Sequence, residues 1–161
     1  METVMKNNRT YLLLAAFAAA LLPVMILRDF TPSNELRYLS IADEALRDGH
    51  LFAFFNHGVP YADKPPLYLW LVMLGRQLFG GHCMAFLSLF SLVPAMVILR
   101  TMDRWAAESG VTVRNRTTAA LMLMTSGLFL GLAVFVRMDM LMCMFITLAL
   151  RSFWLLYTLS L

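Results

Sequence analysis

Three carboxylates and three basic residues occur where the sequence could support chemistry on a charged substrate. They are Glu35, Arg37, Asp63, Lys64, Arg137 and Asp139. A carboxylate can take a proton from an attacking hydroxyl, and lysine or arginine can neutralise a phosphate that leaves. Because these polar residues are interspersed with apolar segments, they predict a site for a substrate that has a lipid tail and a charged head group.

Among the carboxylates, Asp139 has the strongest physical argument for a chemical role. It lies with Arg137 in a short segment between two apolar runs, where a carboxylate is costly unless it is paired or faces a wet cavity. A purely structural ion pair between Asp139 and Arg137 is the alternative. Glu35 also has a second interpretation, as an acidic residue in the first turn of a helix, where the helix dipole favours an anion.

The composition indicates that a membrane protein positions these residues. Of the 161 residues, 60% are apolar and 14% are charged, whereas soluble domains have roughly 45 to 50% and about 25%. The mean hydropathy is +0.70. The net charge of +3 is the mild basic excess that membrane orientation requires. No nucleic-acid partner is expected, because only Trp105 is interleaved with the basic residues of the loop at 100–116.

Four apolar runs approach the length of membrane-spanning helices, which need roughly 17 to 25 residues. The predicted spans cover residues 11–27, 83–99, 117–136 and 140–161. The last includes Arg151, which is costly inside a membrane unless it faces further helices or reaches toward the interface. A shorter apolar run at residues 65–79 suits a helix that lies along the membrane surface.

The arginines predict the orientation of these spans. The loop of residues 100–116 is dense in them, with Arg100, Arg104, Arg114 and Arg116. Cytoplasmic loops carry such an excess, so we expect both termini inside and residues 28–82 outside. The first run is interpreted as an uncleaved signal anchor, because it is longer than the apolar part of a signal peptide and no small-residue cleavage site follows it.

The outer loop at residues 28–82 is expected to contain two amphipathic helices and a hairpin. Apolar residues recur at helical spacing between residues 34 and 48, and Gly49 ends that helix. Residues 51–55 and 59–61 predict two short strands around a tight turn. The two prolines after Lys64 suit the first turn of the second surface helix.

The cysteines and histidines predict no metal or redox centre. Cys83 and Cys143 are expected to be free core residues, although a disulfide between them is geometrically conceivable. His50, His57 and His82 are interpreted as solvated loop residues. No metal-ligand spacing is present in the sequence, so no dedicated metal site is predicted, while dependence on a divalent cation stays open.

Several blocks of the sequence resemble one family in order and spacing. They are Ser33–Tyr38, the following helix to Asp48-Gly49, Gly58–Tyr61, Lys64-Pro65-Pro66 and Arg137-Met138-Asp139. Together they resemble the polytopic glycosyltransferases of the GT-C fold, in the branch that contains the bacterial lipid A aminoarabinose transferase and the protein O-mannosyltransferases. That family has two juxtamembrane helices in an outer loop after its first span, which agrees with the orientation predicted from charge.

The resemblance implies transfer of a sugar from a polyprenyl-phosphate carrier to a lipid, glycan or protein acceptor at the outer face of the bacterial cytoplasmic membrane. It implies that Lys64 and Arg37 bind the carrier phosphate. Asp139 matches the family's second acidic position and is expected to be catalytic.

One position departs from the family pattern. The aspartate of the family's first loop, which acts as the catalytic base or beside it, is replaced here by Asn34. An amide cannot accept the proton, so the base role is assigned to the adjacent Glu35, and Asn34 joins Arg137 among the expected phosphate-binding residues.

We therefore expect an all-α membrane protein with about four spans, in which residues 1–161 form the amino-terminal part of a GT-C glycosyltransferase. Family members are several times longer, and this chain ends inside an apolar run, so the isolated chain is expected to be inactive. The alternative is a non-catalytic multi-spanning protein, either a transporter piece or an assembly subunit that binds a lipid head group without turning it over.

Overall fold

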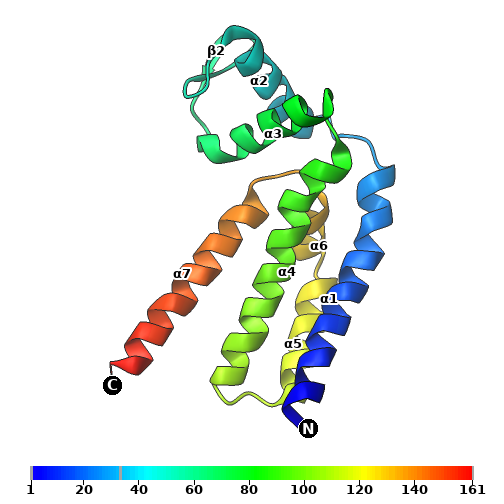
Figure 1. Ribbon diagram of the computed structural model, residues 1–161, viewed down its shortest axis with the longest axis vertical. Helices are drawn as coiled ribbons and strands as arrows, with labels where there is room; N and C mark the ends of the chain where they lie inside the picture. The colour runs from blue at the N-terminus through cyan, green and yellow to red at the C-terminus, as the bar shows by residue number, and fades with distance from the viewer. Residues whose placement is uncertain (1, 33, 161) are drawn as a thin grey trace.

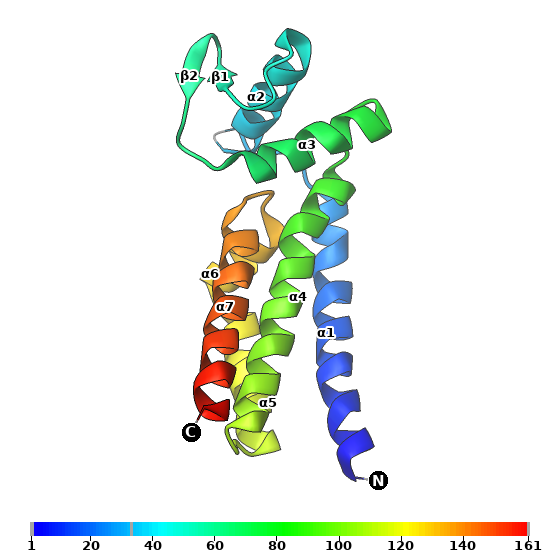
Figure 2. The ribbon, with the colours of Figure 1, turned by 60° about the vertical axis from the view of Figure 1, so that its left-hand side comes forward.

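The protein consists of a bundle of long helices with a smaller cap of helices and strands at one end (Figure 1). The computed structural model describes residues 2–32 and 34–160. Helix α1 begins, and helix α7 ends, at the end of the bundle opposite the cap, and Figure 2 shows the same arrangement from a second side. The expected mostly helical architecture with several candidate membrane spans is confirmed.

The cap is formed by the segment between the first two long helices. The bundle contains α1 (Glu2–Leu27), α4 (Met84–Glu108), α5 (Val113–Thr125), α6 (Gly127–Val134) and α7 (Asp139–Leu159). The cap contains α2 (Glu35–Asp48), β1 (Phe54–Asn56), β2 (Val59–Tyr61) and α3 (Pro66–Phe79). Both surface helices and the hairpin expected in the outer loop are therefore present.

Within the described residues, three helices are long and apolar enough to cross a membrane, namely Arg9–Leu27, Met84–Glu108 and Asp139–Thr158. The run predicted as one span at residues 117–136 forms two helices, α5 and α6, bent by 65° at a short break, and the chain has a fourth candidate span when this pair is counted as one. At the break, Ser126 has an extended backbone, and its side chain accepts a hydrogen bond from the Phe129 amide. The serine thus acts as the N-cap of α6, which explains why a continuous apolar run forms two helices.

Helix α4 continues well beyond the predicted end of its span at residue 99. Its last turns are polar and join the neighbouring helices at the end of the bundle opposite the cap. Asp103 accepts a hydrogen bond from the Thr10 hydroxyl at 2.9 Å and pairs with Arg116 at 3.2 Å. Arg151 of α7 donates to both carboxylate oxygens of Glu108 at 2.7 and 2.9 Å. Arg151 therefore pairs with the polar end of α4.

The molecule has two hydrophobic cores. The cap core lies between α2, α3 and β1, and it also contains Leu87 of α4 together with Val136 and Met138. The bundle core joins α1, α4, α5 and α6, and it includes Met140 at the start of α7. Helix α4 therefore contributes to both cores, and the turn between α6 and α7 joins residues of the bundle core on either side of it to the cap core.

The hairpin of the cap has a two-residue turn. Phe54 pairs with Tyr61 in an antiparallel register, and the turn residues His57 and Gly58 have φ angles of 55° and 77°. Positive φ at both positions matches the twist of the flanking strands. Glu44 of α2 accepts hydrogen bonds from both turn amides at 2.8 Å, which holds the non-glycine residue in this conformation.

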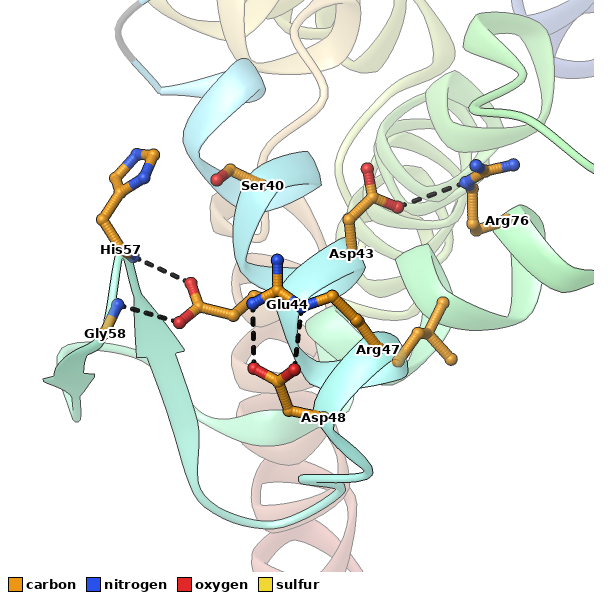
Figure 3. Close-up of a pocket in the computed structure, with 9 residues that line it drawn as sticks. Ser40, Asp43, Glu44, Arg47, Asp48, His57, Gly58 and Arg76 are labelled. Carbon is orange, nitrogen blue, oxygen red and sulfur yellow. Dashed lines mark hydrogen bonds and ion pairs between the residues drawn. The ribbon is translucent and has the colours of Figure 1, made fainter.

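The cysteines and one histidine can now be placed. Cys83 and Cys143 are both free, as expected. His82 departs from its prediction as a solvated residue, because its Nε2 atom lies 3.0 Å from Asp43 and its side chain is mostly buried. Asp43 lies on α2 (Figure 3), so this contact fastens the segment before α4 to the cap.

Candidate functional site

The α6–α7 turn, residues 135–138, lies where the cap meets the bundle (Figure 2). Val136 is 0% exposed and Met138 is also buried. The Ser91 hydroxyl of α4 donates a hydrogen bond to the Phe135 carbonyl at 2.6 Å. Contacts from both parts of the molecule thus hold the segment that carries Arg137 and leads to Asp139.

Glu35 lies at the centre of a buried polar group that we call the Glu35 junction, formed by Arg28, Thr31, Glu35 and Val136. The Glu35 carboxylate is 0% exposed. It accepts hydrogen bonds from two Arg28 nitrogens at 2.5 and 2.7 Å, from the Thr31 amide and hydroxyl at 2.7 and 3.0 Å, and from the Val136 amide at 2.5 Å. The junction therefore connects the end of α1, the start of α2 and the α6–α7 turn.

These bonds determine the charge state of Glu35. Burial alone would raise the pKa of this carboxyl group, but the hydrogen bonds from Arg28, Thr31 and Val136 outweigh it and hold the pKa below its ordinary value. Glu35 is thus an ionised carboxylate whose two oxygens both accept hydrogen bonds. This arrangement suits the structural alternative considered for Glu35 better than a role as proton acceptor.

A second polar group, the Asp139 cluster, lies beside the junction. It comprises Arg37, Tyr38, Tyr61, Asp63, Arg137 and Asp139. Arg137 Nε lies 2.7 Å from Asp139 Oδ2, and the side chains of these two residues remain 35% and 26% exposed. Asp139 is therefore more accessible than Glu35.

The tyrosines show which charges gather around this cluster. Burial raises the pKa of Tyr38, the negative charges of Asp139 and Asp63 raise it further, and the positive charges of Arg137 and Arg37 oppose the rise. Burial also raises the pKa of Tyr61, while a hydrogen bond from Arg37 lowers it. The pKa of the buried Tyr38 phenol is therefore changed by charges from four places, namely α2, the segment before α3, the α6–α7 turn and the start of α7.

The tyrosines of this cluster were not among the residues predicted from the sequence to form the site. The rings of Tyr38 and Tyr68 meet edge to face with centroids 5.6 Å apart, and both residues are buried. Tyr38 follows Glu35 by three positions, so the two share the buried face of α2. That spacing, inside a motif already singled out, is the signal that could have identified Tyr38.

The structure brings some of the predicted site residues together and directs Glu35 into the separate junction. Arg37, Arg137 and Asp139 belong to one cluster, to which Asp63 also contributes charge. Lys64 directly follows Asp63 and is half-buried. Asn34 precedes α2, and its side chain makes no helix-capping hydrogen bond. Glu35 is directed into the junction.

A large cavity lies elsewhere on the cap, on the side of α2 that carries charged residues (Figure 3). It has a volume of ≈ 1050 Å³ and is lined by residues that include Asp43, Glu44, Arg47, Asp48 and Arg76. Asp43 pairs with Arg76 at 3.2 Å, and Asp48 pairs with Arg47 at 2.8 Å. Because none of the residues that line it is a predicted site residue, we assign the candidate site to the Asp139 cluster instead. In the described parts of the chain no group of three or more His, Cys, Asp or Glu residues could hold a metal ion.

Comparisons with known proteins identify relatives for most of the chain. No family model matches the sequence. The undecaprenyl phosphate-alpha-4-amino-4-deoxy-L-arabinose arabinosyl transferase of Pseudomonas savastanoi is 29% identical over 143 residues, which cover 89% of this chain and 27% of that protein. The transferase of the same name from Edwardsiella ictaluri is 31% identical over 123 residues, covering 76% of this chain and 22% of that protein.

Two solved structures share the fold. They are crystal structures of ArnT from Cupriavidus metallidurans, one bound to undecaprenyl phosphate and one in the apo state. The TM-scores are 0.69 and 0.65, the sequence identities are 22% and 23%, and each match covers 88% of this chain and 26% of the other. The chain thus spans about a quarter of the length of the relatives that it matches. The resemblance predicted from the order of the motifs is confirmed: this chain is similar to the amino-terminal portion of the ArnT-like glycosyltransferases of the GT-C fold.

Proposed function

We propose that this chain forms the amino-terminal part of a membrane glycosyltransferase, which transfers a sugar from a polyprenyl-phosphate carrier to an acceptor at the outer face of the bacterial cytoplasmic membrane. The observation that carries the proposal is the Asp139 cluster, where Arg37, Arg137 and Asp139 from separate elements act on the buried Tyr38. Further support comes from relatives whose names specify an undecaprenyl-phosphate-linked sugar.

In this proposal the basic residues of the cluster bind the carrier phosphate. Arg37 and Arg137 supply guanidinium groups, which form strong charge-assisted hydrogen bonds with phosphate oxygens. Lys64 adds an ammonium group from the segment before α3, and the Asn34 amide can donate one further hydrogen bond. Because the cluster lies where the cap meets the apolar bundle, the polyprenyl tail can extend along the spans inside the bilayer.

We propose Asp139 as the base of the reaction. A hydroxyl oxygen of the acceptor attacks the anomeric carbon of the sugar, and the bond from that carbon to the phosphate oxygen breaks. The carrier phosphate leaves with the bonding electrons, and Asp139 takes the hydroxyl proton. Arg37 and Arg137 stabilise the negative charge on the leaving phosphate. Glu35 is a poorer candidate for the base than expected from the sequence, because it is buried and accepts five hydrogen bonds within the junction.

Phosphate binding by the chain itself can be tested in lipid nanodiscs. We expect the chain to bind undecaprenyl phosphate and to bind undecaprenol, which lacks the phosphate, much more weakly. The variants Arg37→Ala and Arg137→Ala should each weaken binding of the phosphate by about tenfold or more, the effect expected when a charged hydrogen bond is lost. Arg114→Ala is the matched control, because Arg114 is an exposed arginine in the first turn of α5, a helix that begins at the end of the bundle opposite the cap (Figure 1). Equal binding of the two lipids, or equal loss in all three variants, would contradict the proposal.

Catalysis needs a second experiment, because the chain spans only about a quarter of its relatives. We expect a chimera in which this chain replaces the matching part of the Cupriavidus transferase to transfer sugar, and Asp139→Asn in the chimera to abolish transfer while undecaprenyl phosphate still binds. The presence of Asn34 instead of a carboxylate favours a second candidate, a subunit that binds the lipid head group without turnover. A chimera that binds undecaprenyl phosphate but transfers no sugar would support that second function.

A further inference from the structure

The α6–α7 turn and the end of α6 are held by the two members of one ion pair. Glu35 accepts a hydrogen bond from the Val136 amide at 2.5 Å, and Arg28 donates to the Val134 carbonyl at 3.0 Å. The Arg28 guanidinium also lies over the Phe135 ring, 5.2 Å from its centroid. Both members of the ion pair therefore contact the backbone or ring of the segment immediately before Arg137.

These contacts restrict the position of the backbone around Val136. Val136 is 0% exposed, so its amide would have no access to bulk water if Glu35 were removed, and an unpaired buried amide is costly. A buried ion pair also tolerates little displacement, because either charge alone would be left without a partner. The position of the Val136 backbone is therefore linked to the position of the Glu35 carboxylate.

Glu35 also belongs to the element that carries the other half of the cluster. It lies in the first turn of α2, two residues before Arg37 and three before Tyr38. Arg137 and Asp139 follow Val136 at the other side of the junction. A single carboxylate thus connects the helix that carries Arg37 to the turn that carries Arg137 and leads to Asp139.

We infer that Glu35 and Arg28 are positioning residues, which set the separation between Arg37 on α2 and the Arg137–Asp139 pair. This inference rests on the proposed function, because it assumes that those groups bind the phosphate and activate the acceptor. Glu35 takes no proton in this scheme. Its role is to hold the α6–α7 turn at the distance at which both arginines reach one phosphate group.

The test measures the turn and the ligand separately in the 161-residue chain. Hydrogen exchange of backbone amides in nanodiscs reports on residues 134–139, and undecaprenyl phosphate binding reports on the site. In Glu35→Ala we expect amide exchange in this segment to accelerate by about tenfold or more, with at least a fivefold loss of undecaprenyl phosphate affinity. Glu35→Gln should restore part of both, because one amide oxygen can still accept the hydrogen bond from Val136.

A matched variant separates positioning from general loss of stability. Asp103→Asn removes a partly buried carboxylate that pairs with Arg116 and lies in the last turns of α4, which ends at the end of the bundle opposite the cap (Figure 1). It should lower the thermal stability of the protein without changing exchange at residues 134–139 or binding of undecaprenyl phosphate. If Asp103→Asn weakens binding as much as Glu35→Ala does, the effect of Glu35 is merely structural and the inference is wrong.

The outcomes also distinguish this inference from the proposed function. Unchanged exchange at residues 134–139 in Glu35→Ala would overturn the positioning role, whatever the binding data show. Accelerated exchange with unchanged affinity would also overturn it, because the turn would then move without consequence for the site. If Arg37→Ala and Arg137→Ala bind undecaprenyl phosphate normally, the proposed function fails independently of the result for Glu35.

Discussion

The substitution Glu35→Gln is expected to remove a pH-dependent part of the stability of the fold. In the native protein the pKa of Glu35 lies below its ordinary value of 4.5, because the hydrogen bonds from Arg28, Thr31 and Val136 outweigh the effect of burial. When folding lowers the pKa of a carboxyl group, that group stabilises the native state at pH values above its pKa in the unfolded chain. That contribution is lost as the pH falls through the folded pKa.

The size of the effect follows from the contacts that glutamine cannot reproduce. Glutamine has nearly the same shape and keeps one acceptor oxygen, but it leaves the Arg28 guanidinium, only 15% exposed, without a charged partner. Removing one member of a buried ion pair costs roughly 3–5 kcal/mol, and the retained amide oxygen reduces this cost. We expect Glu35→Gln to lower the free energy of unfolding by about 2–3 kcal/mol at pH 7.

The assay is reversible unfolding in detergent micelles, followed by circular dichroism and tryptophan fluorescence between pH 7 and pH 3. Every other acidic group is present in both proteins, so the difference between their unfolding free energies reports on Glu35. We expect that difference to be constant down to about pH 5 and to shrink below pH 4.5, as Glu35 takes up a proton in the unfolded state first.

Asp48→Asn provides the control for this experiment. The pKa of Asp48 is also lowered, mainly by a hydrogen bond from Arg47, but the pair lies at the surface, where solvent screens it. Its substitution should leave the unfolding free energy almost unchanged at each pH. A difference between the native protein and Glu35→Gln that is zero at pH 7, or that stays constant from pH 7 to pH 3, would refute the reasoning about the junction.

Two further predictions concern the packing of the helices. A Cβ atom on Gly75 of α3 would lie 2.8 Å from two ring carbons of Phe86 on α4. Gly75→Ala should therefore lower the thermal unfolding temperature, because overpacking costs roughly 1–3 kcal/mol of unfolding free energy. Adding Phe86→Leu should restore part of that temperature, and a double variant that is as unstable as Gly75→Ala would contradict the steric explanation. Arg151→Ala and Glu108→Gln should each lower the free energy of unfolding, because each removes the ion pair between α7 and α4. A double-mutant cycle should show a favourable coupling of about 0.5–3 kcal/mol between the two side chains. Additive effects of the two substitutions would mean that the ion pair does not stabilise the fold.

Much of the fold follows from local patterns that the sequence displays directly. Apolar runs of spanning length account for α1, α4 and α7, because a bilayer core accepts only helices of about that length. Glycine at the end of α2 and proline at the start of α3 mark helix boundaries through their backbone preferences. The hairpin follows from the tight turn between two short apolar segments.

Other features depend on contacts that no local pattern contains. The break at Ser126 was missed, because the run around it is apolar without interruption by charge, and hydropathy does not measure the direction of a helix axis. The end of α4 was placed too early, since its last turns are stabilised by polar partners on other helices, such as Thr10 for Asp103. The sequence left two environments open for Arg151, because its partner Glu108 is 43 positions away in the chain.

In the candidate site, too, some properties follow from the sequence and others depend on tertiary contacts. The sequence by itself determined which residue types are available, and from them it predicted Arg37, Lys64 and Arg137 for the carrier phosphate and Asp139 for catalysis. Only the tertiary structure decided how Glu35 is used, because the Val136 amide that it binds is 101 positions away in the chain. Residue type and helix position determine what a carboxylate can do, but the donors that reach it determine whether it is free to accept a proton or is held as an anchor.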